Sequence, residues 1–154
     1  MSVLSFTGVR KIELTLDLAN RLHERIEEYI KRGCDTFISG GAVNADTWFF
    51  KSCLKHKEKY PHIKLILYQP HPEQDKLYNS AQKEDYKKIV ENADEIVLVS
   101  KEYTPSCFQL RNIQMVNRAD YLLSIWDFSD GGTANTIAYA KTAKNIKEIL
   151  ILKI

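Results

Sequence analysis

WDFSDGGTANT, residues 126–136, joins an apolar run to the start of a predicted helix. The residues that lead into it, Tyr121–Trp126, are aromatic and aliphatic, as in a buried strand. The paired Gly131 and Gly132 allow a sharp turn and the close approach of a ligand. Free backbone N–H groups and the positive end of the helix dipole would then face the turn, which suits phosphate or carboxylate. A purely structural turn explains the same residues, because strand-to-helix connections use glycine and helix caps use Thr, Asp or Asn.

The composition fits one domain over residues 1–154, with 44% hydrophobic residues and a sizeable core. The 22 basic and 20 acidic residues are mixed along the chain and give a net charge of only +2. This balance shows no electrostatic footprint for nucleic acid or a membrane surface, so we expect a small-molecule partner. No apolar stretch reaches membrane-spanning length, and no basic-then-apolar segment opens the chain. These features predict a cytoplasmic protein.

The cysteines and histidines form no metal or disulfide pattern. Cys34, Cys53 and Cys107 are odd in number and widely spaced, which indicates reduced thiols. Cys107 has no histidine nearby in sequence to act as its base, so we interpret it as a structural thiol. The four histidines show no metal-ligand spacing. We therefore expect no metal and no required cofactor, with a nucleotide-derived ligand as the one small molecule indicated.

Strands and helices are predicted to alternate along the chain. The strands are expected at residues 3–7, 36–38, 63–68, 96–99, 121–126 and 148–152. The helices are expected at residues 16–31, from Ala45 to a point before Pro61, at 73–92 in two pieces, from Pro105 to Ala119, and after Gly132. In the third interval between strands, the inward-pointing residues are expected to be Leu77, Tyr78, Ala81, Ile89 and Val90. The alternation predicts an α/β protein with a mostly parallel sheet of about six strands.

Three polar or glycine-rich segments follow strands of this sheet. They are Thr7–Arg10, Ser39–Ala42 with Asp46 one turn later, and the opening stretch, where Thr133, Asn135 and Thr136 add side-chain donors. Ligands of such sheets bind beyond the carboxyl ends of the strands, where the strand order reverses. The convergence of the three segments predicts a pocket for a nucleotide-sized ligand.

Several side chains have a functional and a structural interpretation. Arg10 and Arg111 could hold phosphate oxygens in a bidentate fork, or could be solvated surface arginines. Asp46 could accept ribose hydroxyls or orient a water, or could simply favour the first turn of a helix. Asp127 has the same two interpretations. Trp48 could stack on a base, although an aromatic residue at helical spacing also suits the core.

Four blocks of sequence together resemble the YpsA-like branch of the SLOG superfamily. The blocks are FTGVR at 6–10, SGGA at 39–42 with DTW at 46–48, YTPSC at 103–107 with Arg111-Asn112, and WD at 126–127 with GGTANT at 131–136. The likeness runs in order along nearly the whole chain. It implies a Rossmann-like three-layer sandwich with strand order 3-2-1-4-5-6 that binds a nucleotide or a nucleotide-derived molecule. Because such relatives commonly form dimers or larger assemblies, the resemblance also implies a homo-oligomer.

The resemblance gives the full set of predicted ligand-binding residues. They are Thr7, Gly8, Arg10, Ser39, Gly40, Gly41, Ala42, Asp46, Trp48, Arg111, Asn112, Asp127, Gly131, Gly132, Thr133, Asn135 and Thr136. Replacing Arg111 or Gly132 is expected to abolish ligand binding and to leave the melting temperature nearly unchanged.

Three departures from related patterns bear on the chemistry. The LOG phosphoribohydrolases, a related branch, release a base from a nucleoside monophosphate with a glutamate placed shortly after their glycine loop. Here the first acidic residue after Gly132 is Glu148, which is assigned to the last strand. Within the YpsA-like branch a glycine is common where Asn44 stands, and a histidine is common where Val9 stands.

The leading hypothesis is a sensor, carrier or sequestering module for a phosphorylated nucleoside-type molecule. The alternative is a nucleoside-phosphate N-glycosidase that uses Asp46 or Asp127 in place of the glutamate. The third hypothesis is single-stranded DNA binding, as in the DprA branch. It ranks last because lysines are spread over every predicted helix and most aromatic residues lie in strand-like or inward positions. Neither nucleic acid nor a membrane is an expected partner.

Overall fold

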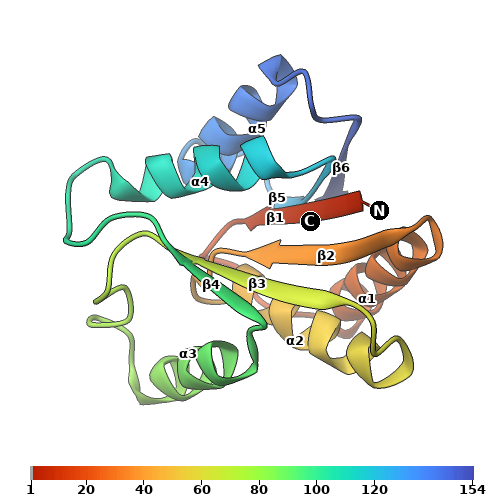
Figure 1. Cartoon of the computed structure of the whole chain (residues 1–154), viewed down its shortest axis with the longest axis horizontal. Helices are drawn as coiled ribbons and strands as arrows, with labels where there is room; N and C mark the ends of the chain where they lie inside the picture. The colour runs from red at the N-terminus through yellow and green to blue at the C-terminus, as the bar shows by residue number, and fades with distance from the viewer. Residues whose placement is uncertain (1) are drawn as a thin grey trace.

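A six-stranded parallel sheet lies between two layers of helices in the computed structural model, which describes residues 2–154 (Figure 1). Helices α1, α2 and α3 cover one face of the sheet, and α4 and α5 cover the other. The predicted three-layer α/β class is therefore confirmed. The strands are β1 (Ser2–Gly8), β2 (Cys34–Ser39), β3 (Lys64–Gln69), β4 (Glu95–Leu98), β5 (Tyr121–Trp126) and β6 (Glu148–Lys153). The helices are α1 (Leu16–Lys31), α2 (Ala45–Lys59), α3 (Ser80–Asn92), α4 (Cys107–Arg118) and α5 (Gly132–Thr142).

The strand order is β4-β3-β2-β1-β5-β6, which differs from the expected 3-2-1-4-5-6 in the place of β4. β4 pairs with β3 at the sheet edge, and β5 takes the position beside β1. The burial of the two strands accounts for the difference. Leu123 and Ile125 of β5 are completely buried, whereas Ile96 and Leu98 of the short β4 stay 42% and 45% exposed. The strand order thus reverses between β1 and β5.

The main core lies between the sheet and helices α1, α2 and α3. Leu4 and Phe6 of β1 point into it, and the Phe6 ring stacks on Phe49 of α2 with ring centroids 4.6 Å apart. Helix α1 begins where the Thr15 hydroxyl accepts a hydrogen bond of 3.1 Å from the backbone N–H of Leu18. Two smaller apolar clusters lie on the opposite face, beneath α4 and α5. The central strands are therefore covered on both faces of the sheet.

The segment between β3 and β4 departs from prediction. Residues 72–77 form turns, and a single helix starts at Ser80 after a capping box made by Asn79 and Gln82. The inward prediction is wrong for Leu77, which is 94% exposed because it precedes the cap. It is also wrong for Ala81, which lies on the outer side of the first turn. Tyr86 takes the buried position instead.

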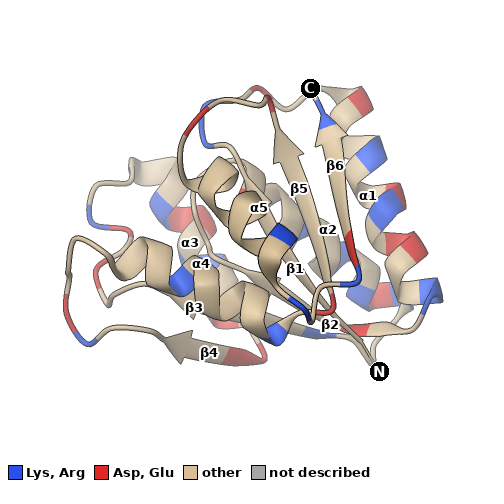
Figure 2. Cartoon of the chain, turned by 90° about the horizontal axis from the view of Figure 1, so that it is seen from above, with Lys and Arg blue, Asp and Glu red and all other residues tan. Residues whose placement is uncertain are grey.

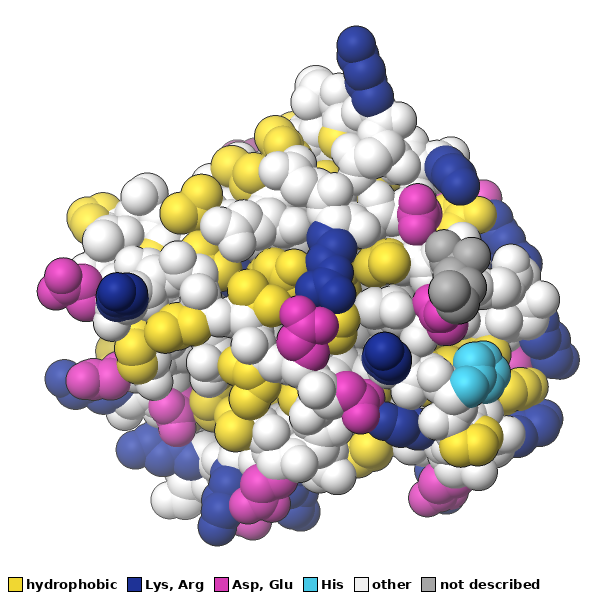
Figure 3. Space-filling view, in the orientation of Figure 1, with side chains coloured by type: hydrophobic (Ala, Val, Ile, Leu, Met, Phe, Trp, Pro, Cys, Tyr) yellow, Lys and Arg dark blue, Asp and Glu magenta, His cyan; other side chains and the backbone are white. Residues whose placement is uncertain are grey.

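The charged residues lie mainly on helices and connecting loops, while the strands carry few of them (Figure 2). Both signs are interspersed on the face shown in Figure 3, so that face has no continuous basic stripe. Within residues 2–154, no helix combines the length and the apolar character needed to cross a membrane. The three cysteines are free and buried.

Candidate functional site

A cavity of about 730 Å³ opens at the carboxyl ends of β1 and β5, where the strand order reverses. We call it the first cavity. β1 and β5 run in parallel register with Gly8 opposite Ile125, and the Val9 N–H donates a hydrogen bond of 3.1 Å to the Ile125 carbonyl. The loops that leave these two strands therefore start side by side. Of the predicted ligand-binding residues, those that line the first cavity are Thr7, Gly8, Arg10, Ala42, Asp46, Arg111, Asn112, Asp127, Gly131, Gly132 and Thr133.

The loop after β1 supplies one wall of the first cavity. Gly8 allows this strand end to pack on α2, because a Cβ there would lie 2.5 Å from the Cβ of Ala45. The exposed Arg10 follows, with its guanidinium 5.6 Å from the centre of the Phe108 ring. Within residues 2–154, no carboxylate forms an ion pair with Arg10. Its charge is available to a ligand.

The start of α5 supplies another wall. Gly131 occupies the N-cap position with φ 138°, a conformation that favours glycine, and no side chain caps the helix. The first helical hydrogen bond runs from the Asn135 N–H to the Gly131 carbonyl, at 3.0 Å. The preceding N–H groups of Gly132 and Thr133 therefore have no partner within the helix and lie at the cavity wall. This end of α5 has the geometry of an anion site.

Asp127 lies in the loop that leads to α5 and is held by its own turn. Its Oδ1 atom accepts hydrogen bonds from the backbone N–H and the hydroxyl of Ser129. These bonds, the side-chain bond first, lower the pKa of the Asp127 carboxyl below its ordinary value. Asp127 is therefore a carboxylate at neutral pH and repels an anion unless a cation or a sugar hydroxyl lies between them.

Asp46 and Arg111 lie buried at the floor of the first cavity. The Asp46 Oδ2 atom accepts a 3.1 Å hydrogen bond from the Ala42 N–H. Burial raises the pKa of the Asp46 carboxyl, and the positive charge of Arg111 opposes this shift. Burial likewise lowers the pKa of Arg111, against the charge of Asp46. The two groups compensate each other, so Arg111 is a buried partner of Asp46 and not a solvated surface arginine.

The loop after β2 is mostly filled by the protein's own side chains, which corrects the predicted position of Ser39, Gly40 and Gly41. The Gly40 carbonyl accepts hydrogen bonds of 2.7 Å from Gln74 and 2.8 Å from Arg111. The Gly41 carbonyl accepts one from the Tyr78 hydroxyl, and the Ser39 hydroxyl accepts one from the Gly41 N–H. These three residues lie below the first cavity, and only Ala42 and Asp46 of this segment line it.

Three further predicted residues lie outside the first cavity. Trp48 packs against the main core, as its helical spacing allowed. Thr136 is buried and donates its hydroxyl to the Gly132 carbonyl at 2.8 Å, within the first turn of α5. Asn135 is exposed on the outer side of the same turn. The side chains of Asn135 and Thr136 are thus directed away by the helical turn that brings Gly132 and Thr133 to the wall.

Phe108 of α4 is a part of the site that the sequence did not indicate. The Phe108 ring lies close to two guanidinium groups, those of Arg10 and Arg111, which are 5.6 and 5.5 Å from the ring centre. The only indication of its role in the sequence was its place just after the predicted start of a helix. The other lining residues without a sequence prediction are Phe6, Val9, Lys11, Pro105, Gln109, Met115, Ser129 and Asp130.

The fold and the first cavity define a Rossmann-like α/β protein with a ligand-sized cavity at its strand-order reversal. A family model described as the YspA SLOG family matches residues 8–153. The chain belongs to this family, which confirms the resemblance in the sequence.

Relatives and a solved structure agree with this assignment. YoqJ, an SPbeta prophage-derived protein of Bacillus subtilis (strain 168), is 35% identical over 139 residues, covering 82% of this chain and 81% of YoqJ. A UPF0398 protein of Bacillus cereus (strain G9842) is 25% identical over 97% of this chain and 86% of its own length. The structure of DNA processing protein A from Helicobacter pylori, described for its single-stranded DNA binding mode, is similar with a TM-score of 0.71 at 20% identity. That match covers 99% of this chain and spans 66% of the other protein, and it shows the shared fold.

Proposed function

We propose that the chain binds a nucleotide or nucleotide-derived small molecule in the first cavity, as a sensor, carrier or sequestering module. One observation carries the proposal: the uncapped start of α5 and the unpaired Arg10 both line the same cavity. Backbone N–H groups and a guanidinium suit a phosphate group. The volume of about 730 Å³ fits a ligand of nucleotide size.

The test is calorimetric titration of the purified protein with AMP, preceded by mass spectrometry of any small molecule released on denaturation. Arg10→Ala is expected to weaken AMP binding by about tenfold or more, because a charge-assisted hydrogen bond contributes about 1.5–3 kcal/mol. Arg25→Ala is the matched control, since Arg25 is a surface arginine of α1 paired with Glu28. Equal AMP affinity in wild type and Arg10→Ala, or no binding of any nucleotide, contradicts the proposal.

A second candidate, cleavage of a nucleoside phosphate, is favoured by the carboxyl group of Asp46 at the cavity floor. A carboxyl group there could assist departure of the base, and the first turn of α5 contains no acidic residue that could serve instead. Release of free base from a nucleotide panel, lost in Asp46→Asn, would establish turnover. If the wild type binds a nucleotide but releases no base, only the hypothesis of a sensor, carrier or sequestering module remains.

A third candidate, single-stranded DNA, gains weight from the fold neighbour. The similar structure from Helicobacter pylori is described as binding single-stranded DNA, which questions the expectation that nucleic acid is no partner. Exposed Tyr103 and half-buried Phe108 are two aromatic side chains that a base could stack on, although most aromatic residues lie inward as expected. A mobility shift of single-stranded DNA that weakens steeply with salt would support this candidate.

A further inference from the structure

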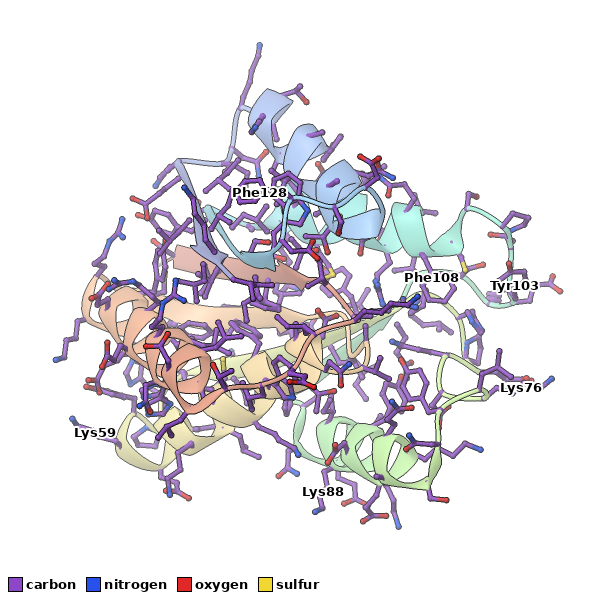
Figure 4. All side chains as sticks on the ribbon, turned by 180° about the vertical axis from the view of Figure 1, so that it is seen from behind. Lys59, Lys76, Lys88, Tyr103, Phe108 and Phe128 are labelled. Atoms are coloured by element: carbon purple, nitrogen blue, oxygen red, sulfur yellow. The ribbon has the colours of Figure 1, made fainter. Side chains whose placement is uncertain are left out.

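A second cavity of about 580 Å³ adjoins the first and shares two wall residues with it, Arg10 and Phe108. The loop after β3 forms one side of it, with His71, Leu77 and Tyr78 among its residues. The loop after β4 forms the other side. Figure 4 shows Tyr103 and Phe108 on the same side of the molecule as Lys76, between α4 and α3. Arg10 therefore stands at the boundary between two neighbouring cavities.

The walls of the second cavity include aromatic and apolar side chains that stay exposed. The His71 ring meets the Tyr103 and Phe108 rings edge-on, with centroids 5.4 and 5.6 Å apart. Tyr103 is 63% exposed and Leu77 is 94% exposed, although both are large and partly or wholly apolar. A planar aromatic guest would cover them and gain both apolar burial and ring contacts.

The charges of the second cavity suit a base better than a phosphate. Lys76 and Lys101 line it together with Glu73 and Glu102, and Lys76 lies 3.7 Å from Glu73 in an ion pair. The charges of these two loops therefore nearly cancel. The His71 Nδ1 atom accepts a hydrogen bond from the Glu73 N–H, so its Nε2 atom carries the proton and can donate to a heterocycle.

We propose that the second cavity binds a second heterocyclic base of the same ligand, so that the chain recognises a dinucleotide. This inference depends on the proposed function, because the first nucleotide occupies the first cavity. The linking phosphate passes Arg10, which is the one cation shared by both cavities. The ligand class is then a molecule with two bases joined through phosphate, and a mononucleotide fills only half of the site.

The experiment compares AMP with the 5′-phosphorylated dinucleotide pApA by calorimetric titration of the full chain. Wild type is expected to bind pApA about tenfold more tightly than AMP, as stacking of one more base predicts. Tyr103→Ala is expected to reduce the pApA affinity to that of AMP while AMP binding is unchanged, and Tyr103→Phe is expected to keep both. The Tyr103 hydroxyl has no hydrogen bond within residues 2–154, and the side chain is exposed, so this variant should fold. Leu77→Ala should act in the same direction, with Leu16→Ala on α1 as the matched exposed control.

The possible failures are distinguishable. If AMP and pApA bind equally to wild type, or if Tyr103→Ala weakens both equally, the second subsite is refuted and the proposed function stands. If neither binds, the proposed function fails together with this inference. If a short oligodeoxyadenylate binds far more tightly than pApA, and with steep salt dependence, the occupant is a nucleic-acid strand and the dinucleotide proposal is overturned.

Discussion

The Nη1 atom of Arg111 donates a hydrogen bond of 2.8 Å to the carbonyl oxygen of Gly40, which lies 71 residues earlier in the chain. This contact joins α4 to the loop after β2 and places the guanidinium beside the buried carboxyl of Asp46. Arg111 thus supports the floor of the first cavity from below, so its loss should affect the fold as well as the ligand.

Arg111→Met is expected to lower the free energy of unfolding by about 3–5 kcal/mol, because it leaves the buried Asp46 without its cation. This reverses the sequence-based expectation of a nearly unchanged melting temperature. Urea denaturation measures the loss, and Arg25→Met on the surface of α1 is the control. The double variant Asp46→Asn with Arg111→Met should recover part of the stability. A loss within about 0.5 kcal/mol, as for a surface residue, would show that Arg111 carries no structural role.

Gly40→Ala tests how tightly the buried pair is packed. A Cβ at this position would lie 2.9 Å from Cζ of Arg111 and 3.0 Å from Oδ2 of Asp46. Both groups are buried and hydrogen-bonded, so neither can move freely, and a loss of about 1–3 kcal/mol in the free energy of unfolding is expected. Unchanged urea denaturation would mean that the loop after β2 adjusts without cost.

Gly132→Ala contrasts with Gly40→Ala, because a Cβ at position 132 would meet no atom within 4 Å. Alanine at the start of α5 is expected to leave the free energy of unfolding unchanged or to raise it by about 0.5–1 kcal/mol. Because Gly132 lines the first cavity, the added methyl group should nevertheless weaken AMP binding. Thermal denaturation and calorimetric titration separate the two effects. Full AMP affinity in this variant would indicate that the phosphate does not approach the start of α5.

The sequence was sufficient for elements whose pattern is local. The apolar run of β5 extends over Tyr121–Trp126 as predicted, and α1 extends over Leu16–Lys31, because a four-residue apolar spacing and the turn at Gly33 define it without reference to other segments. The glycine turn before α5 could also be predicted from the sequence, since paired glycines after a buried strand are compatible with few other structures. Of these elements, β5 and the glycine turn position the wall of the first cavity at the start of α5.

The rest depended on contacts between distant segments, which no local pattern encodes. The apolar run of β4 fits an interior or an edge strand equally well. Only its pairing with β3 determines that it lies at the edge of the sheet. The loop after β2 looked like an open glycine turn, yet Gln74 and Tyr78, more than 30 residues later, fill it with their side chains. The periodicity around Leu77 predicted a buried helix face, but the cap at Asn79 starts the helix too late to include it.

Stability should fall in mildly acidic solution because of His23. Its ring stacks on His56 with centroids 3.7 Å apart, and burial, followed by the charge of His56, lowers its pKa below 6.5. The unfolded chain therefore binds a proton at higher pH than the folded chain does, so the stability present above about pH 6.5 is lost as the pH falls toward the folded pKa. Urea denaturation between about pH 5 and pH 8 should show this slope. His23→Asn should reduce the dependence of stability on pH, and His62→Asn, at an exposed position, should not. Equal slopes in both variants would show that a group other than His23 causes the effect.

Asn44 adopts φ 64° and ψ −108°, a conformation that glycine reaches freely and that other residues rarely adopt. Asparagine tolerates such a conformation better than most residues do, and the Asn44 side chain also donates a hydrogen bond to the Arg10 carbonyl. Asn44→Gly is expected to keep the free energy of unfolding within about 0.5 kcal/mol of wild type, because relief of backbone strain offsets the lost hydrogen bond. Asn44→Val is expected to lower it by about 1–3 kcal/mol, because a β-branched residue tolerates positive φ worst. Urea denaturation of the two variants gives the comparison. Equal stability of the valine and glycine variants would mean that the bond to Arg10, and not the backbone conformation, determines the residue at this position.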